Sequence, residues 1–153
     1  MPFQFQFDVT DSGQPKLITL DSTSGYTHYT TTSWTSLHQE IRTFNDFGTF
    51  PASSIDANGD LHMVYSHPTI EKLYYSYETV SGWSSSEILS NANLSSSPSL
   101  WFDQGDMHIL YRDSSLDRLE QLTKSGSSWS TATRLETGEA VGTEHAMLQV
   151  PSG

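Results

Sequence analysis

Two histidines occupy the same place in two copies of one short phrase. His62 lies in GDLHMVY, and His108 lies in GDMHILY, 46 residues further along the chain. An imidazole can accept or donate a hydrogen bond and can act as a general base near neutral pH. The two rings could contact a ligand in equivalent pockets, or each could form a hydrogen bond with a neighbouring strand or turn. Repetition inside a predicted strand favours the second role, and Lys16 in a third copy shows that imidazole is not obligatory.

Large aromatic side chains are the second set of candidate ligand contacts. Trp34, Trp83 and Trp129 each open the last strand of a predicted repeat unit. An indole face can stack on the C–H face of a pyranose while its N–H donates a hydrogen bond, although packing between sheets would place these rings equally well. Trp101 has no counterpart in the other units. We expect it either to contact a ligand or to fill the centre of a ring of sheets.

Carboxylates and known catalytic motifs give little support for an enzyme. Asp56 and Asp103 lie at corresponding hairpins, where a carboxylate could bind a cation but more often accepts hydrogen bonds from turn amides. The chain contains no cysteine, and its six histidines show no metal-ligand spacing beyond His62 and His67. It lacks a Gly-x-Ser-x-Gly, a His-Glu-x-x-His and a phosphate-binding loop. The pattern therefore predicts no catalytic residue, no metal and no cofactor, and it favours a non-catalytic protein.

The charge of the chain limits the classes of partner. Its net charge is −11, with 18 acidic residues against 7 lysines and arginines. Such a surface repels nucleic-acid phosphates and anionic lipids, so we expect neither nucleic acid nor a membrane as a partner. No apolar run approaches the roughly 18 residues that span a bilayer, and residues 1–10 show no signal peptide. A soluble protein of undetermined compartment is expected.

The phrase that carries the histidines belongs to a longer repeat. Five positions recur with a spacing of 46 residues, namely Gly59, His62, Tyr65, Leu73 and Trp83 as Gly105, His108, Tyr111, Leu119 and Trp129. A less regular copy before them aligns Gly13 with Gly59, and the end of the chain resembles the opening strand of a further copy. The chain therefore divides into units at about 2–44, 45–91 and 92–138, with an extra strand within 139–153.

Each unit has the pattern of four short strands joined by tight turns. In the second unit we expect strands at about 52–56, 61–66, 72–79 and 83–89. Asn58-Gly59 and Ser81-Gly82 between these runs are typical of hairpin turns. Residues 36–44 are a weak candidate for a helical turn.

Alternation along the strands predicts sheets that are packed on both faces. Leu61, Met63 and Tyr65 share one face of their strand, whereas His62 and Val64 share the other. Because bulky groups occur on both faces, neither face is expected to be fully exposed to water. A four-stranded unit that packs between copies of itself is a propeller blade, so the predicted fold class is all-β, with three blades and one extra strand per chain.

The third unit resembles the repeats of known propellers. Its segments PSLWFDQGDMHILYRD, LDRLEQL and SGSSWS are similar to repeats of sialidase-like and fucose-lectin-like β-propellers, and the resemblance covers nearly the whole chain. It implies the architecture more strongly than a function, because unrelated activities share the propeller fold. The Asp-box spacing of sialidases, Ser-x-Asp-x-Gly-x-x-Trp, is not kept in this chain.

The resemblance also suggests where a sugar would bind. In fucose-lectin-like propellers, pockets between blades combine a tryptophan with an arginine and a glutamate on adjacent strands. Glu120 stands at the glutamate position of the third unit, but His108 replaces the arginine, with Arg112 nearby, and Tyr74 replaces the glutamate of the second unit. The set is incomplete and does not specify fucose. The candidate sugar-binding residues are Trp34, Trp83, Trp129, Trp101, Glu120, His62 and His108.

Three units and one strand are too few to close a ring, since propellers have about four to eight blades. Open terminal sheets expose apolar faces and unpaired strand edges, so we expect self-association, and a six-bladed homodimer is favoured. The predicted function is non-catalytic, lectin-like binding of a neutral glycan at the blade junctions. The alternatives are a fragment of a sialidase-like glycoside hydrolase or polysaccharide lyase, and a scaffold propeller without a ligand.

Overall fold

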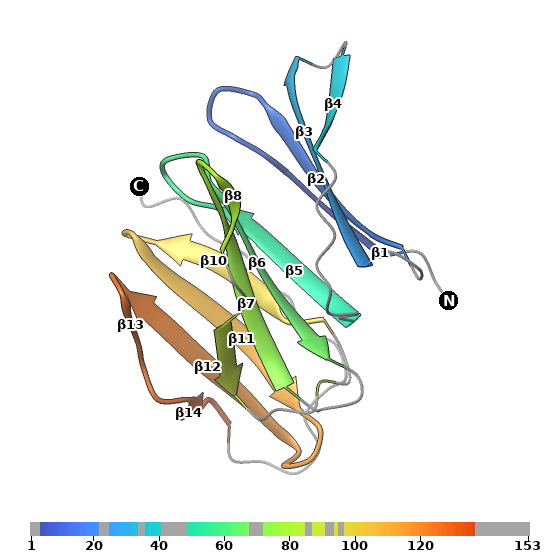
Figure 1. Cartoon of the computed structure of the whole chain (residues 1–153). Coiled ribbons are helices and arrows are strands. Elements are labelled where there is room, and N and C mark those ends of the chain that lie inside the picture. The colour runs from blue at the N-terminus through green and yellow to red at the C-terminus, as the bar shows by residue number, and fades with distance from the viewer. Residues whose placement is uncertain are drawn as a thin grey trace.

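Three antiparallel sheets follow one another along the chain (Figure 1). The computed structural model describes residues 4–21, 25–33, 36–40, 49–67, 72–84, 87–90, 94 and 97–136. Every regular element among these residues is a β-strand. The described part of the chain accordingly contains no helix with the length and apolar character of a membrane span. The prediction of an all-β fold is confirmed.

The first sheet contains four strands in chain order, β1 (Gln4–Val9), β2 (Pro15–Asp21), β3 (Gly25–Ser33) and β4 (Ser36–Glu40). The expected helical turn at 36–44 is wrong over the part that the structure describes, because residues 36–40 form β4. The backbone of β4 pairs with β3, placing Gln39 opposite Tyr29. Ladder pairing of this kind overrides a weak local preference for helix.

The second sheet has the same order, with β5 (Thr49–Ile55), β6 (Leu61–His67), β7 (Lys72–Thr79), β8 (Gly82–Trp83) and β9 (Glu87–Ser90). The strand predicted at 83–89 is divided, since β8 and β9 each pair with β7. Ser84 follows β8 and holds it against β7. Its N–H donates to the Tyr77 carbonyl at 2.9 Å, and its hydroxyl accepts the Tyr77 N–H at 3.0 Å.

The third sheet copies the second, with β10 (Ser99–Asp103), β11 (Asp106–Asp113), β12 (Arg118–Ser125), β13 (Ser128–Trp129) and β14 (Thr133–Arg134). Strands β13 and β14 both pair with β12. The pairing of the first two strands is shifted by one residue relative to the 46-residue repeat, because Ser54 pairs with His62 whereas Trp101, 47 residues after Ser54, pairs with His108. The extra strand predicted within 139–153 lies outside the described residues.

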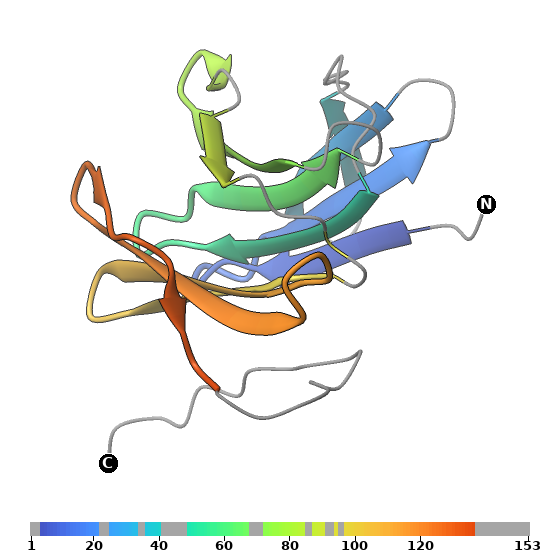
Figure 2. The same ribbon diagram turned by 90° about the horizontal axis from the view of Figure 1, so that it is seen from below.

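The sheets approach each other through their first strands. Strand β5 lies beside β1 on one side and beside β10 on the other, and the three sheets form successive layers (Figure 2). First strands that meet while the later strands extend outward are the arrangement of propeller blades. The four-stranded blade pattern predicted from the repeat is therefore present.

Apolar side chains cover both faces of the second sheet, as the alternation predicted. One cluster joins it to the third sheet and contains Ala52, Val64, Leu73, Tyr75, Met107, Ile109, Tyr111 and Leu122. A separate cluster contains Leu61, Met63, Tyr65 and Tyr74, which project from the opposite face. Burying a large apolar side chain contributes roughly 1.5–3 kcal/mol, so contacts between sheets are a main source of stability.

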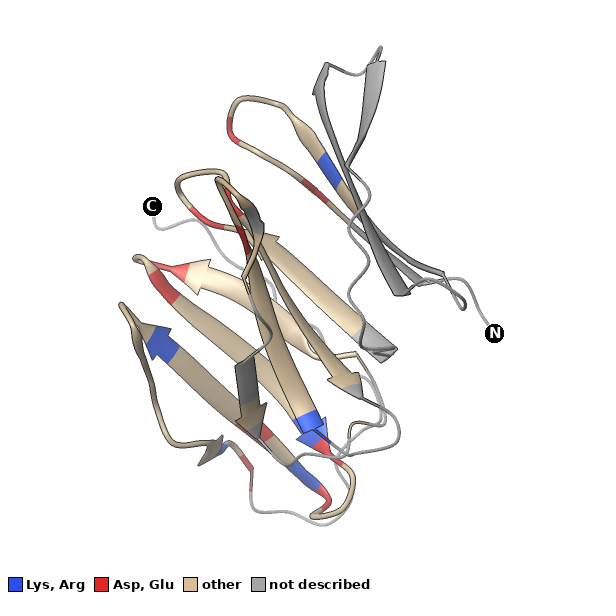
Figure 3. Cartoon of the chain, in the orientation of Figure 1, with Lys and Arg blue, Asp and Glu red and all other residues tan. Residues whose placement is uncertain are grey.

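The turns between the first two strands of each sheet carry carboxylates (Figure 3). In the second sheet, Asp56 Oδ1 accepts the backbone N–H groups of Asn58 and Asp60, both at 2.9 Å. These bonds match the turn role expected for Asp56. Gly59 and Gly105 close the corresponding turns with φ of 85° and 91°, a conformation that glycine adopts without the penalty of a Cβ.

Candidate functional site

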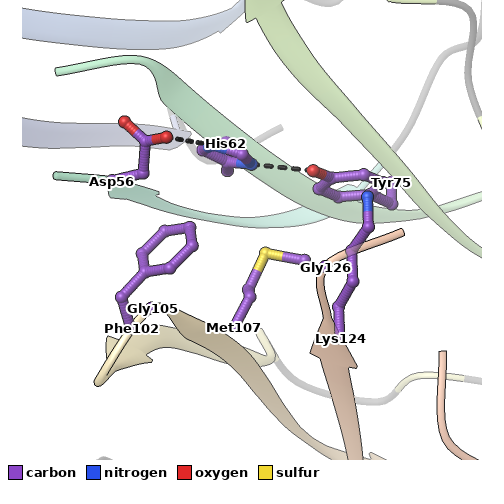
Figure 4. A pocket seen from close by; sticks show the side chains of 8 residues that line it. All are labelled: Asp56, His62, Tyr75, Phe102, Gly105, Met107, Lys124 and Gly126. Atoms are coloured by element: carbon purple, nitrogen blue, oxygen red, sulfur yellow. Dashed lines mark hydrogen bonds and ion pairs between the residues drawn. The ribbon is translucent and has the colours of Figure 1, made fainter. Parts of the chain in front are cut away.

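A cavity of about 180 Å³ lies between the second and third sheets (Figure 4). Its volume is below the roughly 300–1,000 Å³ that is usual for drug-sized ligands, so it suits a small polar molecule. The lining comes from both sheets and consists of Asp56, His62 and Tyr75 on one side, and Phe102, Gly105, Met107, Lys124 and Gly126 on the other. The cavity is thus a feature of the junction and belongs to neither sheet alone.

His62 projects from β6 toward the third sheet and lies between two partners. Its Nδ1 is 2.7 Å from the hydroxyl oxygen of Tyr75, and its Nε2 is 3.6 Å from Asp56 Oδ2. The second distance is too long for a good hydrogen bond, and Nε2 has no hydrogen-bond partner among the described residues. Nε2 is therefore a buried polar atom that faces the Asp56 carboxylate without a good hydrogen bond.

The environment of His62 favours the neutral imidazole. Burial lowers the pKa of His62 below its ordinary value, the nearby ammonium of Lys124 lowers it further, and the Asp56 carboxylate opposes both effects. Burial is the largest of these influences, because a charged ring loses its hydration there. A neutral ring keeps one nitrogen as a donor and the other as an acceptor.

Lys124 enters the cavity from β12, and its ammonium lies over aromatic rings. Its Nζ is 4.6 Å from the ring centre of Tyr75, 5.5 Å from that of Tyr77 and 5.4 Å from that of Trp129. These distances are within the range of cation–π attraction. No hydrogen bond or carboxylate joins Lys124 to another side chain in the part of the chain that the structure describes. Its N–H donors are accordingly available to oxygen atoms of a ligand.

Aromatic rings line the remaining sides of the junction. His62 stacks on Tyr77 with ring centres 5.7 Å apart, and it meets Phe102 edge-on at 4.9 Å. Trp129 meets Tyr75 edge-on at 5.3 Å, and its Nε1 has no hydrogen-bond partner among the described residues. The junction therefore combines ring faces with polar donors, which is the combination that sugars require.

The two repeated histidines do not share a kind of pocket. His108 projects from the opposite face of the third sheet, where its ring stacks on Trp101 at 5.1 Å. Its Nδ1 lies 3.1 Å from Gln121 Nε2 and 3.2 Å from Thr123 Oγ1. His108 and Trp101 thus form a second group away from the cavity, and each histidine has the neighbouring-strand contact expected of a bridging role.

The other candidate residues are dispersed. Glu120 is buried and accepts a hydrogen bond from the Tyr111 hydroxyl at 2.8 Å, with Arg118 at 3.7 Å; it does not line the cavity. Trp83 packs against the cluster on the first-sheet side of the second sheet. Trp34 lies outside the described residues. Of the seven candidates, the structure brings His62 and Trp129 to one junction.

Several residues of the junction were not among the sequence candidates. Lys124, Tyr75 and Phe102 line the cavity but carry no motif. Tyr77 pairs with His62 across two adjacent strands, and Tyr75 lies two residues before Tyr77. Alternation therefore places Tyr75 on the same face of the sheet as His62. Lys124 lies 46 residues after Glu78 and so occupies the same repeat position, but no pattern within one unit identifies the residues of the next blade.

The described residues contain no group of three or more His, Cys, Asp or Glu that could hold a metal ion.

No protein-family model matches the chain, and a search of curated proteins gives no match. Solved structures do match. A mutant of the Aleuria aurantia lectin in complex with α-methyl-L-fucoside has a TM-score of 0.69 at 14% identity, over 92% of this chain and 47% of that one.

Two further structures show the same likeness. The Aleuria aurantia lectin mutant with Fucα1-6GlcNAc has a TM-score of 0.68 at 14% identity, over 92% of this chain and 47% of that one. A triple arginine-to-alanine mutant of AofleA from Arthrobotrys oligospora has a TM-score of 0.62 at 12% identity, over 90% and 43%. The chain therefore has a β-propeller fold and spans about half the length of these structures. They give no support to the predicted likeness to sialidase repeats.

Proposed function

We propose that the protein is a non-catalytic lectin-like propeller that binds a neutral sugar in the cavity between its second and third sheets. The observation that carries the proposal is that one cavity brings the His62 imidazole and the Lys124 ammonium beside the rings of Tyr75 and Phe102. Sugar hydroxyls need donors and acceptors, and the C–H faces of sugars need aromatic surfaces. The two needs are met within one cavity.

The charge of the chain and its structural neighbours narrow the sugar class. A net charge of −11 disfavours anionic sugars at the surface. The Aleuria aurantia lectin, whose fold this chain resembles, has been solved with α-methyl-L-fucoside and with Fucα1-6GlcNAc. L-Fucosides are therefore the first sugars to test, with His62 and Lys124 supplying polar groups and Phe102 supplying a ring in the cavity lining.

Self-association belongs to the same proposal. A propeller needs about four to eight blades, and this chain spans about half the length of its lectin neighbours. Two copies would provide a six-bladed ring, in which His108 and Trp101 would face the next blade. Light scattering during gel filtration should give twice the 17.1 kDa of one chain. A stable species of 17.1 kDa would refute the dimer without refuting the cavity.

The binding proposal is tested with a glycan array, followed by calorimetry with α-methyl-L-fucoside. Lys124→Met keeps much of the side-chain volume and removes the charge. Loss of one hydrogen bond to a charged group costs about 1.5–3 kcal/mol, so we expect the affinity to fall by about ten- to a hundredfold. Lys72→Met is the matched control, because Lys72 does not line the cavity. Binding to no sugar at all would favour a scaffold and defeat the proposal.

A further inference from the structure

The two internal junctions of the chain are built from the same repeat positions. The junction of the second and third sheets has His62 facing Lys124, whereas the junction of the first and second sheets has Lys16 and Glu78 at the corresponding positions, 46 residues earlier. Gly59 likewise corresponds to Gly105. The same backbone positions therefore carry different charges at the two junctions.

At the first junction these positions are joined to each other. The Lys16 ammonium forms an ion pair with the Glu78 carboxylate, and the two side chains are 8% and 18% exposed. Glu78 Oε2 also accepts the backbone N–H of Leu61 at 3.1 Å. A buried pair with such extra hydrogen bonding satisfies its own polar groups. By contrast, Lys124 at the second junction has no carboxylate partner among the described residues, and His62 faces Asp56 of its own sheet at 3.6 Å without a hydrogen bond from Nε2.

The space around Gly59 at the first junction also differs from the space around Gly105 at the second. A Cβ placed on Gly59 would lie 3.6 Å from Cγ2 of Thr10, whereas a Cβ on Gly105 would have no atom within 4 Å. Thr10 is itself buried, with 8% of its surface exposed. A cavity of about 180 Å³ lies beside each glycine, but at the first junction its lining consists of turn residues and includes neither Lys16, Leu61 nor Glu78. At the second junction the cavity extends to His62, Met107 and Lys124.

We propose that the Lys16–Glu78 ion pair occupies, at the first junction, the position that a sugar takes at the second. The inference rests on the proposed sugar binding, and it assigns one ligand position to the two internal junctions. The ammonium and carboxylate take the hydrogen-bonding places that sugar hydroxyls would otherwise fill. Residue 78 at the first junction and residue 124 at the second determine whether the junction is closed by an ion pair or open to a sugar. A carboxylate at this position neutralises the basic residue across the junction, whereas an ammonium does not.

Thiol labelling tests the closed state without any sugar. The chain has no cysteine, so Leu61→Cys and Met107→Cys place single thiols at corresponding positions of the two junctions. Both native side chains are buried, at 1% and 2% exposure, but Met107 lines the cavity. Iodoacetamide should modify Met107→Cys at least about tenfold faster than Leu61→Cys. Met63→Cys, in the same cluster as Leu61, reports labelling through unfolding.

Removal of the ion pair completes this test. Lys16→Ala with Glu78→Ala should raise the labelling rate of Leu61→Cys toward that of Met107→Cys and leave Met63→Cys unchanged. Equal rates at the two junctions of the otherwise unaltered chain would overturn the inference, as would no response to removal of the pair. If a variant fails to fold by circular dichroism, Ile55→Cys and Phe102→Cys provide the same comparison.

Calorimetry with α-methyl-L-fucoside then measures the number of sites. Lys16→His with Glu78→Lys copies the polar pair of the second junction into the first, so the stoichiometry per chain should rise by one. Unchanged stoichiometry in a folded variant with an open first junction would overturn the inference. Failure of the unaltered chain to bind any sugar would instead defeat the proposed function, and the labelling result would still decide whether the first junction is closed.

Discussion

The Nδ1 atom of His62 lies 2.7 Å from the hydroxyl oxygen of Tyr75, and Tyr75 is 1% exposed. Because the hydroxyl is buried, its hydrogen bond to the imidazole replaces the water that it would otherwise bind. The contact also orients the ring, so that Nε2 is directed toward Asp56 (Figure 4). One hydrogen bond thus links the packing of the two strands to the geometry of the candidate site.

We first predict that Tyr75→Phe destabilises the protein. It leaves Nδ1 of His62 buried without its partner, and such a loss costs about 1–3 kcal/mol. Urea denaturation measures the change in the free energy of unfolding. His62→Phe combined with Tyr75→Phe removes both ends of the bond, so the double variant should lose less than the sum of the single losses. Strict additivity would show that the contact does not couple the two side chains.

The second prediction concerns pH. The folded state lowers the pKa of His62, chiefly through burial, so the unfolded chain binds a proton more readily than the folded chain. Stability should therefore be complete above the ordinary imidazole pKa and should decrease as the pH falls toward the folded-state pKa. Urea midpoints between about pH 8 and pH 5 measure this dependence. His62→Gln should reduce the slope in that window, and an unchanged slope would contradict the assignment.

The third prediction concerns the glycines of the hairpin turns. Gly59 and Gly105 have φ of 85° and 91°, so alanine at either position should cost about 1 kcal/mol or more. Asparagine tolerates this region better than other residues, so Gly105→Asn should be less destabilising than Gly105→Ala. Thermal melting of the four alanine and asparagine variants provides the comparison. Equal effects of both side chains would mean that backbone conformation is not the cause.

The fourth prediction separates Glu120 from sugar binding. Its carboxylate is buried against the Tyr111 hydroxyl and does not line the cavity. Glu120→Ala should destabilise the chain by about 1–3 kcal/mol, because the hydroxyl loses its acceptor. The affinity for α-methyl-L-fucoside should change by less than about twofold at a temperature where the variant is folded. A large loss of affinity with little loss of stability would restore the role implied by the fucose-lectin resemblance.

The sequence predicted the sheets well because their signal is local and repeated. Hairpin turns such as Asn58-Gly59 and alternation along β6 depend on neighbours within a few residues, and the structure contains both. The helical turn at 36–44 was wrong, since the pairing of β4 with β3 decides that backbone. The division of the fourth strand was also missed, because the bonds of Ser84 to Tyr77 act across two strands.

Sequence reasoning named two residues of the junction, and their role in binding stays a prediction. His62 and Trp129 were identified from the repeat. Tyr75, which contacts both of them, was not: it forms a hydrogen bond with His62 and meets the ring of Trp129 in the adjacent sheet edge-on. Lys124 was missed because its neighbours are supplied by another repeat unit. A repeat pattern predicts the strands and turns within one unit, whereas the side chains that meet at a junction come from two units whose sequences differ. His62 and His108 therefore look alike in sequence and have different surroundings.

The meeting of β1, β5 and β10 near one another, with β8, β9, β13 and β14 further out along their sheets, has a practical consequence (Figure 1). Lengthening a first strand would disturb every neighbouring layer, whereas the short outer strands touch fewer elements. Peptide tags and reporter insertions should accordingly be tolerated at the perimeter, for example in the turn at 80–81 between β7 and β8, where Val80 is fully exposed. The molecule thus offers a periphery for engineering and a central region that must be left intact.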